Sequence, residues 1–350
     1  MLKKNIYILV FLCSSFLSLA QNTSNLIFSQ INEENGLSDN HVTCVLKDKQ
    51  GLVWIGTEDG LNLLDGSSIK VFKHRDKDST TLTNDYIKDI KEDTEGNIWI
   101  ATSLGLNCYN KKLQYFFNYS LAPSPYSTSA IIFSIQIDGN TIWCGTDGGL
   151  FKFNKENGSS IFFECGKEES LANRRFCNKT NCVVLDENKI CWLCTALGLW
   201  SFDTKDNSFK KQILIDNDPH FNPLILTALN DANNKLWVGS WQYGLKLFDK
   251  KTGEVTNYVN PSNYLTPVFS IAKVVQADGK ALLWLNGNLN AFDPATSTFF
   301  QYKKPLLLSE YPSVRGNYVS ADNWVWTFTD KGLYIIIPSG KYSITRFLIL

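Results

Sequence analysis

Seven tryptophans recur at nearly even spacing along this chain of 350 residues, and that spacing constrains the fold more than any other feature. The steps between them are 45, 44, 49, 45, 47 and 42 residues. A period in this range is typical of repeat architectures, in which each repeat forms one supersecondary unit. Seven units nearly fill the chain, so the repeats themselves form the domain. The tryptophans are Trp54, Trp99, Trp143, Trp192, Trp237, Trp284 and Trp326.

The first complete repeat predicts four short strands, at residues 42–47, 52–57, 61–64 and 69–73. Turns rich in Asp and Gly separate them, because these residues accept the backbone conformations that tight turns need. Four antiparallel strands in about 45 residues are typical of a propeller blade. The predicted fold class is therefore all-β: a seven-bladed β-propeller of four-stranded antiparallel blades, spanning residues 21–341.

The repeated tryptophans are predicted to be core residues rather than ligand contacts, since a side chain present in every blade serves the repeat. A Gly or Ala commonly stands two residues after the Trp, and its small size lets the neighbouring sheet approach closely. Two segments compete to close the ring as the outer strand of the Trp326 blade. We predict closure by the N-terminal strand at residues 26–31. Residues 342–350 then form a surplus strand, a possible start of a missing second propeller.

The N-terminus resembles a cleavable export signal. Lys3 and Lys4 precede an apolar stretch at residues 6–17, and small residues end at Ala20. This pattern predicts a signal peptide at residues 1–20, cleavage after Ala20 and a periplasmic protein. The apolar stretch is too short for a typical membrane-spanning helix, and no later stretch is long and apolar enough to cross a membrane.

Charge and cysteine content narrow the possible partners. Loss of Lys3 and Lys4 leaves 34 − 2 = 32 basic residues against 34 acidic ones, which gives no electrostatic reason to expect nucleic acid as a partner. Cys191 and Cys194 form a CxxC, but within a strand positions three apart point to opposite faces, which excludes chelation of one ion. We expect small buried hydrophobes there, with a disulfide among Cys165, Cys177 and Cys182 left open.

The segment from Gly36 to Asp65, GLSDNHVTCVLKDKQGLVWIGTEDGLNLLD, resembles the two-component regulator propeller repeat. The resemblance is strong in the first two repeats and looser in the last two. It implies the extracytoplasmic sensor region of hybrid two-component regulators of Bacteroidetes, which detect polysaccharide fragments. Such sensors typically carry two propellers, a membrane helix and a histidine kinase. The chain shows one propeller and no kinase motif, so the resemblance implies a truncated or split sensor.

No motif indicates catalysis, a metal site or a cofactor. The histidines His41, His74 and His220 lie far apart in the sequence, and no nucleophile elbow or phosphate-binding glycine pattern appears. We therefore expect a non-catalytic protein that binds an oligosaccharide or similar small ligand. A protein-interaction or dimerisation propeller, and an exported lyase or hydrolase, remain alternatives. A second propeller or a second copy of the chain would be a further partner.

In a propeller, the loops from the second to the third strand and from the fourth strand to the next blade share one face. Trp241, Gln242 and Tyr243 are the most distinctive residues there, because two aromatics flanking an amide suit a sugar. The alternative for Trp241 is packing against a neighbouring loop. The predicted ligand-binding residues are Glu58, Asp59, Tyr126, Asp147, Arg174, Arg175, Trp241, Gln242, Tyr243 and Arg315.

Overall fold

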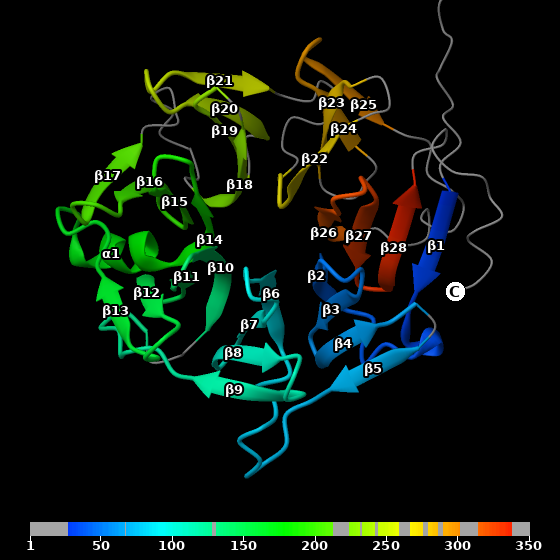
Figure 1. Ribbon diagram of the computed structural model, residues 1–350. Coiled ribbons are helices and arrows are strands. Elements are labelled where there is room, and N and C mark those ends of the chain that lie inside the picture. The colour runs from blue at the N-terminus through cyan, green and yellow to red at the C-terminus, as the bar shows by residue number, and fades with distance from the viewer. Residues whose placement is uncertain are drawn as a thin grey trace, which may run out of the picture.

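The computed structural model describes residues 27–66, 68–127, 131–212, 224–231, 233–241, 244–258, 267–275, 279–285, 290–301 and 314–337. Within these ranges, seven four-stranded antiparallel sheets stand around a central axis, as Figure 1 shows. This arrangement confirms the predicted seven-bladed propeller. The predicted signal peptide and the segment 342–350 lie outside the described residues.

Each blade runs from an innermost first strand to an outermost fourth strand, in chain order for blades 1 to 6. The strands of blades 1 to 3 are β2 (Val42–Lys47), β3 (Val53–Thr57), β4 (Gly60–Leu64), β5 (Ile69–Phe72), β6 (Ile87–Glu92), β7 (Ile98–Thr102), β8 (Gly105–Asn110), β9 (Tyr115–Tyr119), β10 (Ile132–Asp138), β11 (Thr141–Thr146), β12 (Leu150–Asn154) and β13 (Ser160–Phe163). Those of blades 4 to 6 are β14 (Thr180–Leu185), β15 (Ile190–Thr195), β16 (Gly198–Asp203), β17 (Ser208–Gln212), β18 (Ile225–Asp231), β19 (Lys235–Ser240), β20 (Leu245–Asp249), β21 (Val255–Tyr258), β22 (Ile271–Val275), β23 (Ala281–Leu285), β24 (Asn290–Asp293) and β25 (Thr298–Gln301).

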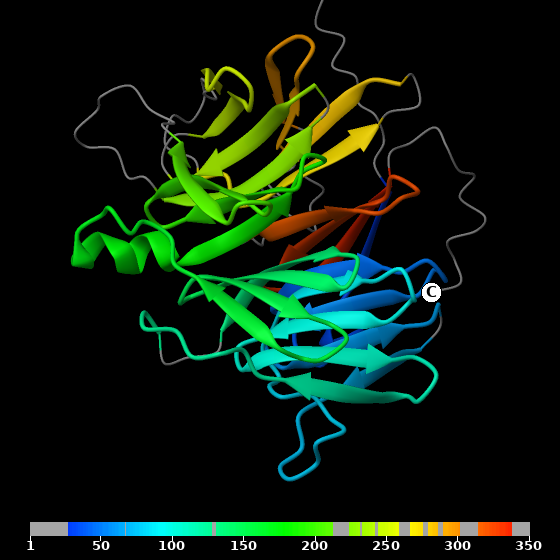
Figure 2. The ribbon, with the colours of Figure 1, turned by 60° about the vertical axis from the view of Figure 1, so that its left-hand side comes forward.

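Blade 7 joins the two ends of the described chain. It consists of β26 (Val314–Val319), β27 (Val325–Thr329), β28 (Gly332–Ile337) and β1 (Ile27–Ile31), in that order across the sheet. The N-terminal strand β1 pairs antiparallel with β28, with Ile31 opposite Leu333. The ring is thus closed by the N-terminal strand, as predicted. The described elements also include a 3-10 turn, η1 (Glu33–Asn35), and one α-helix, α1 (Leu171–Asn178), which stands out from the ring between blades 3 and 4 (Figure 2).

The hydrophobic core is a ring of seven clusters, each formed by two neighbouring blades. All seven repeat tryptophans are at least 96% buried in these clusters, which confirms their predicted core role. A Cβ added at Gly145, two residues after Trp143, would lie 2.7 Å from the Val183 side chain of the next blade. The small residue therefore does allow the close approach that the sequence predicted.

A polar contact missed by the sequence analysis anchors several of the tryptophans. In blade 2, Asp93 Oδ1 accepts hydrogen bonds from the backbone of Glu95 and Asn97, while Oδ2 accepts one from Trp99 Nε1 at 2.9 Å. Lys155 of blade 3 reaches back to the same Oδ2 at 3.0 Å, and both charged side chains are buried. One carboxylate thus closes a turn, fixes an indole and ties its blade to the next.

The same Trp–Asp–Lys triad, which we call the interblade triad, recurs at three further interfaces. Asp48, Asp186 and Asp231 each accept a hydrogen bond from the Trp six residues later and an ion pair from a lysine of the following blade. Blade 3 lacks it, because the turn before Trp143 is shorter and Trp143 Nε1 has no hydrogen-bond partner. The interface between blades 3 and 4 is therefore held without this contact.

The described cysteines are all free thiols. Cys191 and Cys194 lie in different core clusters, one between blades 3 and 4 and the other between blades 4 and 5, which confirms that the CxxC points to opposite faces of its sheet. Cys165 and Cys177 share the first of these clusters, whereas Cys182 packs against the second. A disulfide from Cys182 to Cys165 or Cys177, which the sequence left open, is therefore wrong for this fold.

Candidate functional site

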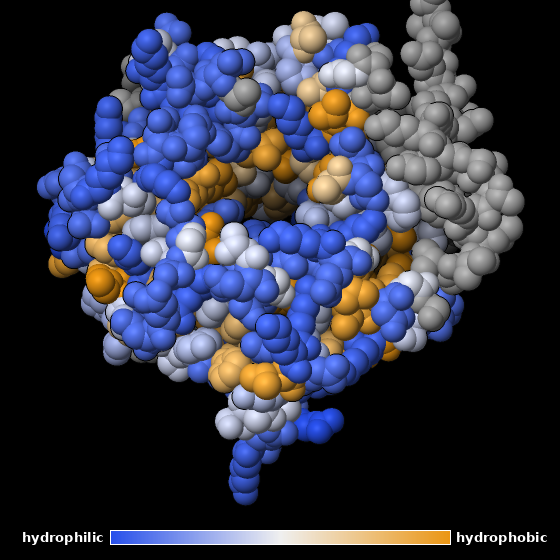
Figure 3. All heavy atoms as spheres, in the orientation of Figure 1, coloured by the Kyte–Doolittle hydropathy of each residue, from blue (hydrophilic) through white to orange (hydrophobic). Residues whose placement is uncertain are grey.

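The face formed by the second-to-third-strand turns carries the candidate site. At this end of the ring the first strand of six blades contains a β-bulge. A bulge inserts one residue that has no partner across the sheet and re-aims its side chain. Because the first strands are innermost, the inserted residues surround the mouth of the central channel. Figure 3 shows a hollow at the centre of the molecule, with many hydrophilic residues around it.

We call these inserted residues the rim positions. Phe269 takes the corresponding place in blade 6, directly after the buried Val268. Most rim side chains are half-buried, and their chemistry differs around the ring. The rim positions are Thr43, Lys88, Phe133, Asn181, Leu226, Phe269 and Arg315.

Three of the predicted site residues share a second equivalent position, directly after the second strand. Glu58, Asp147 and Trp241 each donate their backbone N–H to the carbonyl that stands one residue before the first strand of their own blade. They therefore belong to blades 1, 3 and 5 at the same level of the ring. The repeat thus brings these residues to one face, as the sequence predicted.

On one side of the mouth, blades 7, 1 and 2 contribute a charged group that we call the mouth cluster: Glu58, Tyr86, Lys88 and Arg315. The Glu58 carboxylate is paired with the Arg315 guanidinium and accepts a hydrogen bond from the Tyr86 hydroxyl at 3.2 Å. Lys88 lies over the Tyr86 ring. Arg315 was predicted to lie in a loop, and this is wrong: it lies in β26, where the bulge turns a strand residue toward the mouth.

The charges of the mouth cluster are tuned by one another and by burial. Burial acts to raise the pKa of Glu58, but the hydrogen bond and charge of Arg315 outweigh it and hold that pKa below its ordinary value. Burial lowers the pKa of Lys88 to about 8, with Arg315 adding to the effect and Glu58 opposing it. Burial and the neighbouring Glu58 raise the pKa of Tyr86. The mouth therefore holds a fixed carboxylate–guanidinium pair beside an amine that titrates at mildly alkaline pH.

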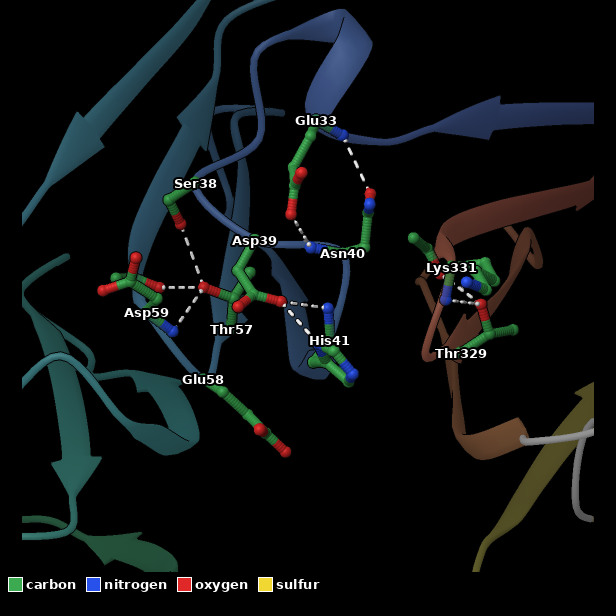
Figure 4. Close-up of polar contacts among 12 residues, drawn as sticks. Glu33, Ser38, Asp39, Asn40, His41, Thr57, Glu58, Asp59, Thr329 and Lys331 are labelled. Carbon is green, nitrogen blue, oxygen red and sulfur yellow. Dashed lines mark hydrogen bonds and ion pairs between the residues drawn. The ribbon is translucent and has the colours of Figure 1, made fainter.

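His41 and Asp39 stand next to the mouth cluster. Figure 4 shows them with Glu58, between blade 1 and the β27–β28 turn of blade 7 that carries Thr329 and Lys331. Asp39 Oδ1 accepts a hydrogen bond from the His41 backbone and lies 2.8 Å from His41 Nδ1. Glu33 and Asn40 bond each other's backbone N–H groups and fix this segment. His41 is thus a positioned, partly exposed group that sequence reasoning dismissed as isolated.

Asp59 does not join the mouth cluster. Its carboxylate forms an ion pair with Lys73 at 2.6 Å, within blade 1, and both side chains are exposed. Its backbone N–H bonds the Thr57 hydroxyl, which itself contacts Ser38 (Figure 4). The adjacent residues Glu58 and Asp59 therefore have different roles. Glu58 belongs to the mouth cluster, and Asp59 makes its contacts within blade 1.

Aromatic residues occupy another side of the same face. Trp241 packs edge-to-face against Phe269, with ring centroids 5.5 Å apart, and the two residues are 40% and 39% exposed. The alternative for Trp241, packing against a neighbouring loop, is thus confirmed, and the pair still exposes apolar surface on this face. Gln242 and Tyr243 lie outside the described residues.

A third group lies where the outer parts of blades 3 and 4 meet. Glu164 accepts a hydrogen bond from the Tyr126 hydroxyl and lies 3.5 Å from Arg174. Asp147 accepts a hydrogen bond from the hydroxyl of Ser127, which is next to Tyr126 in the segment before β10. Arg174 and Arg175, predicted as ligand-binding loop residues, instead lie in α1, which Ser170 caps, and Arg175 is exposed. Within the described ranges, the partners of Glu164, Tyr126 and Arg174 come from blade 3 and from the segment around α1 rather than from the mouth cluster.

Sequence reasoning missed Tyr86, Lys88, Glu164 and Phe269. Lys88 follows Ile87, the first buried residue of β6, and Phe269 follows the buried Val268 just before β22, a signal that comparing the repeats would have revealed. No group of three His, Cys, Asp or Glu side chains within the described ranges is arranged to hold a metal ion. The described helix is far shorter than a membrane crossing requires, and none in these ranges has the necessary apolar length.

Comparison with known sequences agrees with the repeat. Residues 36–59 and 81–103 match the two component regulator propeller family. Each range contains the first two strands of its blade, β2 and β3 in blade 1 and β6 and β7 in blade 2. Histidine kinase P4 of Formosa agariphila is 37% identical over 82 residues, which cover 23% of this chain and 6% of that protein.

Solved structures share the fold. The extracellular domain described for the hybrid two component system BT3049 of B. thetaiotaomicron superposes with a TM-score of 0.72 at 24% identity, covering 89% of this chain and 42% of that one. The corresponding domain of BT4673 gives 0.69 at 18% identity, covering 88% and 39%. Streptogramin B lyase gives 0.67 at 15% identity, covering 89% and 97%. The chain spans less than half of the two extracellular domains. Two of its segments match the two component regulator propeller family, as its sequence predicted.

Proposed function

We propose that this chain is a non-catalytic sensor propeller of a two-component system and that it binds an oligosaccharide at the mouth of its central channel. The repeats matched in blades 1 and 2 support this assignment. So does the similarity to a histidine kinase and to extracellular domains of hybrid two-component systems. The proposal includes export to the periplasm through the N-terminal signal, with cleavage after Ala20.

The observation that carries the proposal is the two-sided chemistry around the mouth. Blades 7, 1 and 2 contribute the paired charges and hydroxyl of the mouth cluster, while blades 5 and 6 contribute the exposed Trp241–Phe269 pair. A sugar presents hydroxyls at its edge and C–H groups on its faces. Charged hydrogen-bonding groups suit the hydroxyls, and aromatic rings suit the apolar faces.

The proposed sensor acts with further domains. Each of the two extracellular domains that share this fold is more than twice the length that this chain matches. A second propeller or a second copy of the chain would then cover part of the same face and pass the binding event on. We include in the proposal that this chain is one part of a truncated or split sensor.

Titration calorimetry of the purified chain against a panel of oligosaccharides from different polysaccharides tests the proposal. For the sugar that binds, Trp241→Ala and Phe269→Ala should each raise Kd about tenfold, the loss of one aromatic contact of about 1.4 kcal/mol. Phe117→Ala is the matched control, because Phe117 is an exposed aromatic that packs on Tyr115 far out on β9. It should leave Kd unchanged.

Two results would count against the proposal. Binding that survives Trp241→Ala, Phe269→Ala and Glu58→Gln unchanged would move the site away from the mouth. A chain that binds no sugar of the panel but forms a concentration-dependent dimer by light scattering would favour the protein-interaction alternative.

One observation keeps the enzyme alternative worth a direct test. Tyr86, Lys88 and the positioned His41 stand beside an arginine, and groups of these kinds perform proton transfer in many enzymes. A turnover assay for unsaturated or shortened products on the same panel decides it. Product formation that is lost in Tyr86→Phe would replace the sensor proposal with a lyase or hydrolase.

A further inference from the structure

Blade 4 places two thiols opposite each other across its innermost strand pair. Cys182 of β14 lies directly opposite Cys194 of β15 in the antiparallel register. Residues opposite each other in such a pair have side chains on the same face of the sheet. Each thiol shifts the pKa of the other, as two groups close together in space do.

The equivalent pair in blade 1 shows how close these positions are. There Cys44 lies opposite Gly56, with the same bulge in the strand. A Cβ added at Gly56 would lie 2.6 Å from Cys44 Sγ. In a disulfide, the Cβ of one residue lies about 3 Å from the sulfur of the other, as follows from the S–S bond length. The register at this bulge therefore brings Cβ and Sγ to about the separation that a disulfide has.

Among the equivalent pairs that the structure describes, the pair in blade 4 is the one with a cysteine at both positions. The corresponding pairs elsewhere combine one thiol, or none, with a small residue or a phenylalanine: Cys44 with Gly56, Asp89 with Ala101, Ser134 with Gly145, Thr227 with Gly239, and Gly316 with Phe328. The other cysteines of this region are placed differently, since Cys191 lies opposite Leu185 and faces another cluster.

We propose that Cys182 and Cys194 form a cross-strand disulfide when the chain meets an oxidant of the disulfide class, either a thiol–disulfide oxidoreductase or oxidised glutathione. The Cys182 thiolate attacks one sulfur of the oxidant, which releases one reduced thiol and leaves a mixed disulfide. Cys194 then loses its proton and attacks Cys182 Sγ, which releases the second reduced thiol. Two thiols of the protein are oxidised and one disulfide of the oxidant is reduced to two thiols.

The order of attack follows from the surroundings of the two sulfurs. The hydrogen bond from Cys194 lowers the pKa of Cys182 despite its burial, while burial raises the pKa of Cys194 well above the ordinary thiol value. Cys182 is also the only one of the described cysteines that is partly exposed. It is therefore the thiol that an oxidant reaches first.

The bond would fix the rim beside it. Asn181 is the rim position of blade 4, inserted by the bulge directly before Cys182. Its side-chain amide donates a hydrogen bond to the Ile225 carbonyl of blade 5 at 3.0 Å. A covalent link one residue away holds the bulge, and with it the approach of blades 4 and 5 at the channel mouth.

Peptide mapping of the full chain tests the proposal. The reduced, folded protein is incubated with oxidised glutathione, remaining thiols are alkylated in denaturant at low pH, and the chain is digested with trypsin without reductant. Cleavage after Lys179, Lys189 and Lys205 puts Cys182 in the peptide 180–189 and Cys191 and Cys194 in the peptide 190–205. We expect these two peptides to appear as one linked species that dithiothreitol separates.

Variants assign the link to one sulfur. Cys191→Ser should retain the linked species, and Cys194→Ser should lose it. Recovery of both wild-type peptides with Cys182 and Cys194 alkylated after oxidation would overturn the proposal. So would a link that survives Cys194→Ser but not Cys191→Ser, or a link from Cys182 to the peptide that contains Cys165 or Cys177. The wild-type map needs no variant to fold, so a variant that fails to fold leaves the main result intact.

Discussion

The interblade triad of blades 2 and 3 predicts an unusually large effect for a change of one atom. In Asp93→Asn, an amide NH2 replaces one carboxylate oxygen of a fully buried side chain. In the wild-type protein, Asp93 Oδ2 accepts hydrogen bonds from Trp99 Nε1, Lys155 Nζ and Asn97 Nδ2, and Oδ1 accepts hydrogen bonds from two backbone N–H groups. Whichever way the amide turns, at least two donors lose their acceptor.

The magnitude follows from those donors. A buried donor left without an acceptor costs about 1–3 kcal/mol, and a charged one costs more. Lys155 is charged and its side chain is only 6% exposed, so its loss lies at the upper end. Asp93→Asn should therefore lower the free energy of unfolding by about 4 kcal/mol.

Blade 3 supplies the matched control. Asp138, the last residue of β10, stands at the corresponding place, but Trp143 Nε1 has no hydrogen-bond partner among the described residues. Asp138 pairs with the half-exposed Lys189 at 2.6 Å. Exposed ion pairs contribute about 0–1 kcal/mol, so Asp138→Asn should cost less than about 1 kcal/mol. The two substitutions are chemically identical and differ only in what the carboxylate holds.

Guanidinium chloride titration, followed by tryptophan fluorescence and far-UV circular dichroism, measures both variants. Coincident transitions from the two probes justify a free energy from the midpoint and slope. Equal shifts for Asp93→Asn and Asp138→Asn, or a cost below about 1 kcal/mol for Asp93→Asn, would refute the triad as a major source of stability.

Three further outcomes follow from the structure. Burial acts to raise the pKa of Asp93, but hydrogen bonds from Trp99, Lys155 and Asn97 hold that pKa below the ordinary 3.8. The difference in unfolding free energy between wild type and Asp93→Asn should therefore be complete above about pH 4 and shrink as the pH falls further, which denaturant titrations repeated from pH 7 to pH 3 would measure. Lys88 should titrate near pH 8 in NMR of protein labelled at lysine Cε, because burial disfavours its charge, and a midpoint above 10 would contradict this. Gly145→Ala should cost about 1–3 kcal/mol, since its Cβ would lie 2.7 Å from Val183 and 2.9 Å from Thr180; an unchanged Tm would show that blades 3 and 4 can separate freely.

The repeat made most of the fold predictable. One blade was readable from the alternation of β-rich runs and Gly-containing turns, and the predicted first strand at 42–47 coincides with β2. The spacing of the seven tryptophans then located the other six blades in the sequence. Closure by β1 was predictable because its sequence stands in the same relation to the next repeat as other fourth strands do.

The site was less predictable because it depends on where strands are irregular. A bulge is one extra residue, and period-two reading of β26 places Arg315 no differently from its neighbours. The mouth cluster also joins Arg315 to Glu58, which is 257 residues away in the sequence. Only the closed ring brings them together, so reading each repeat separately could not pair them.

The Asp six residues before several of the tryptophans shows a different limit. Its spacing from the tryptophan is visible in the sequence of blades 1 and 2. Its partners were not visible, because Lys111 and Lys155 come from the following blade and stand 63 and 62 residues downstream of the carboxylates they bind. Contacts between repeats appear in the sequence only once the geometry of their stacking is known.

The pairing of β1 with β28 also sets an order of events for the growing chain. Every other blade pairs segments that are close in sequence, whereas Ile27 meets Ile337 after 337 − 27 = 310 intervening steps. Local pairings form faster than distant ones, so blades 1 to 6 can assemble as the chain emerges. Until β28 arrives, β1 has no sheet to join, and the row of blades is an open arc with an unpaired strand edge exposed to other chains. Ring closure thus removes the unpaired β1 from contact with other chains.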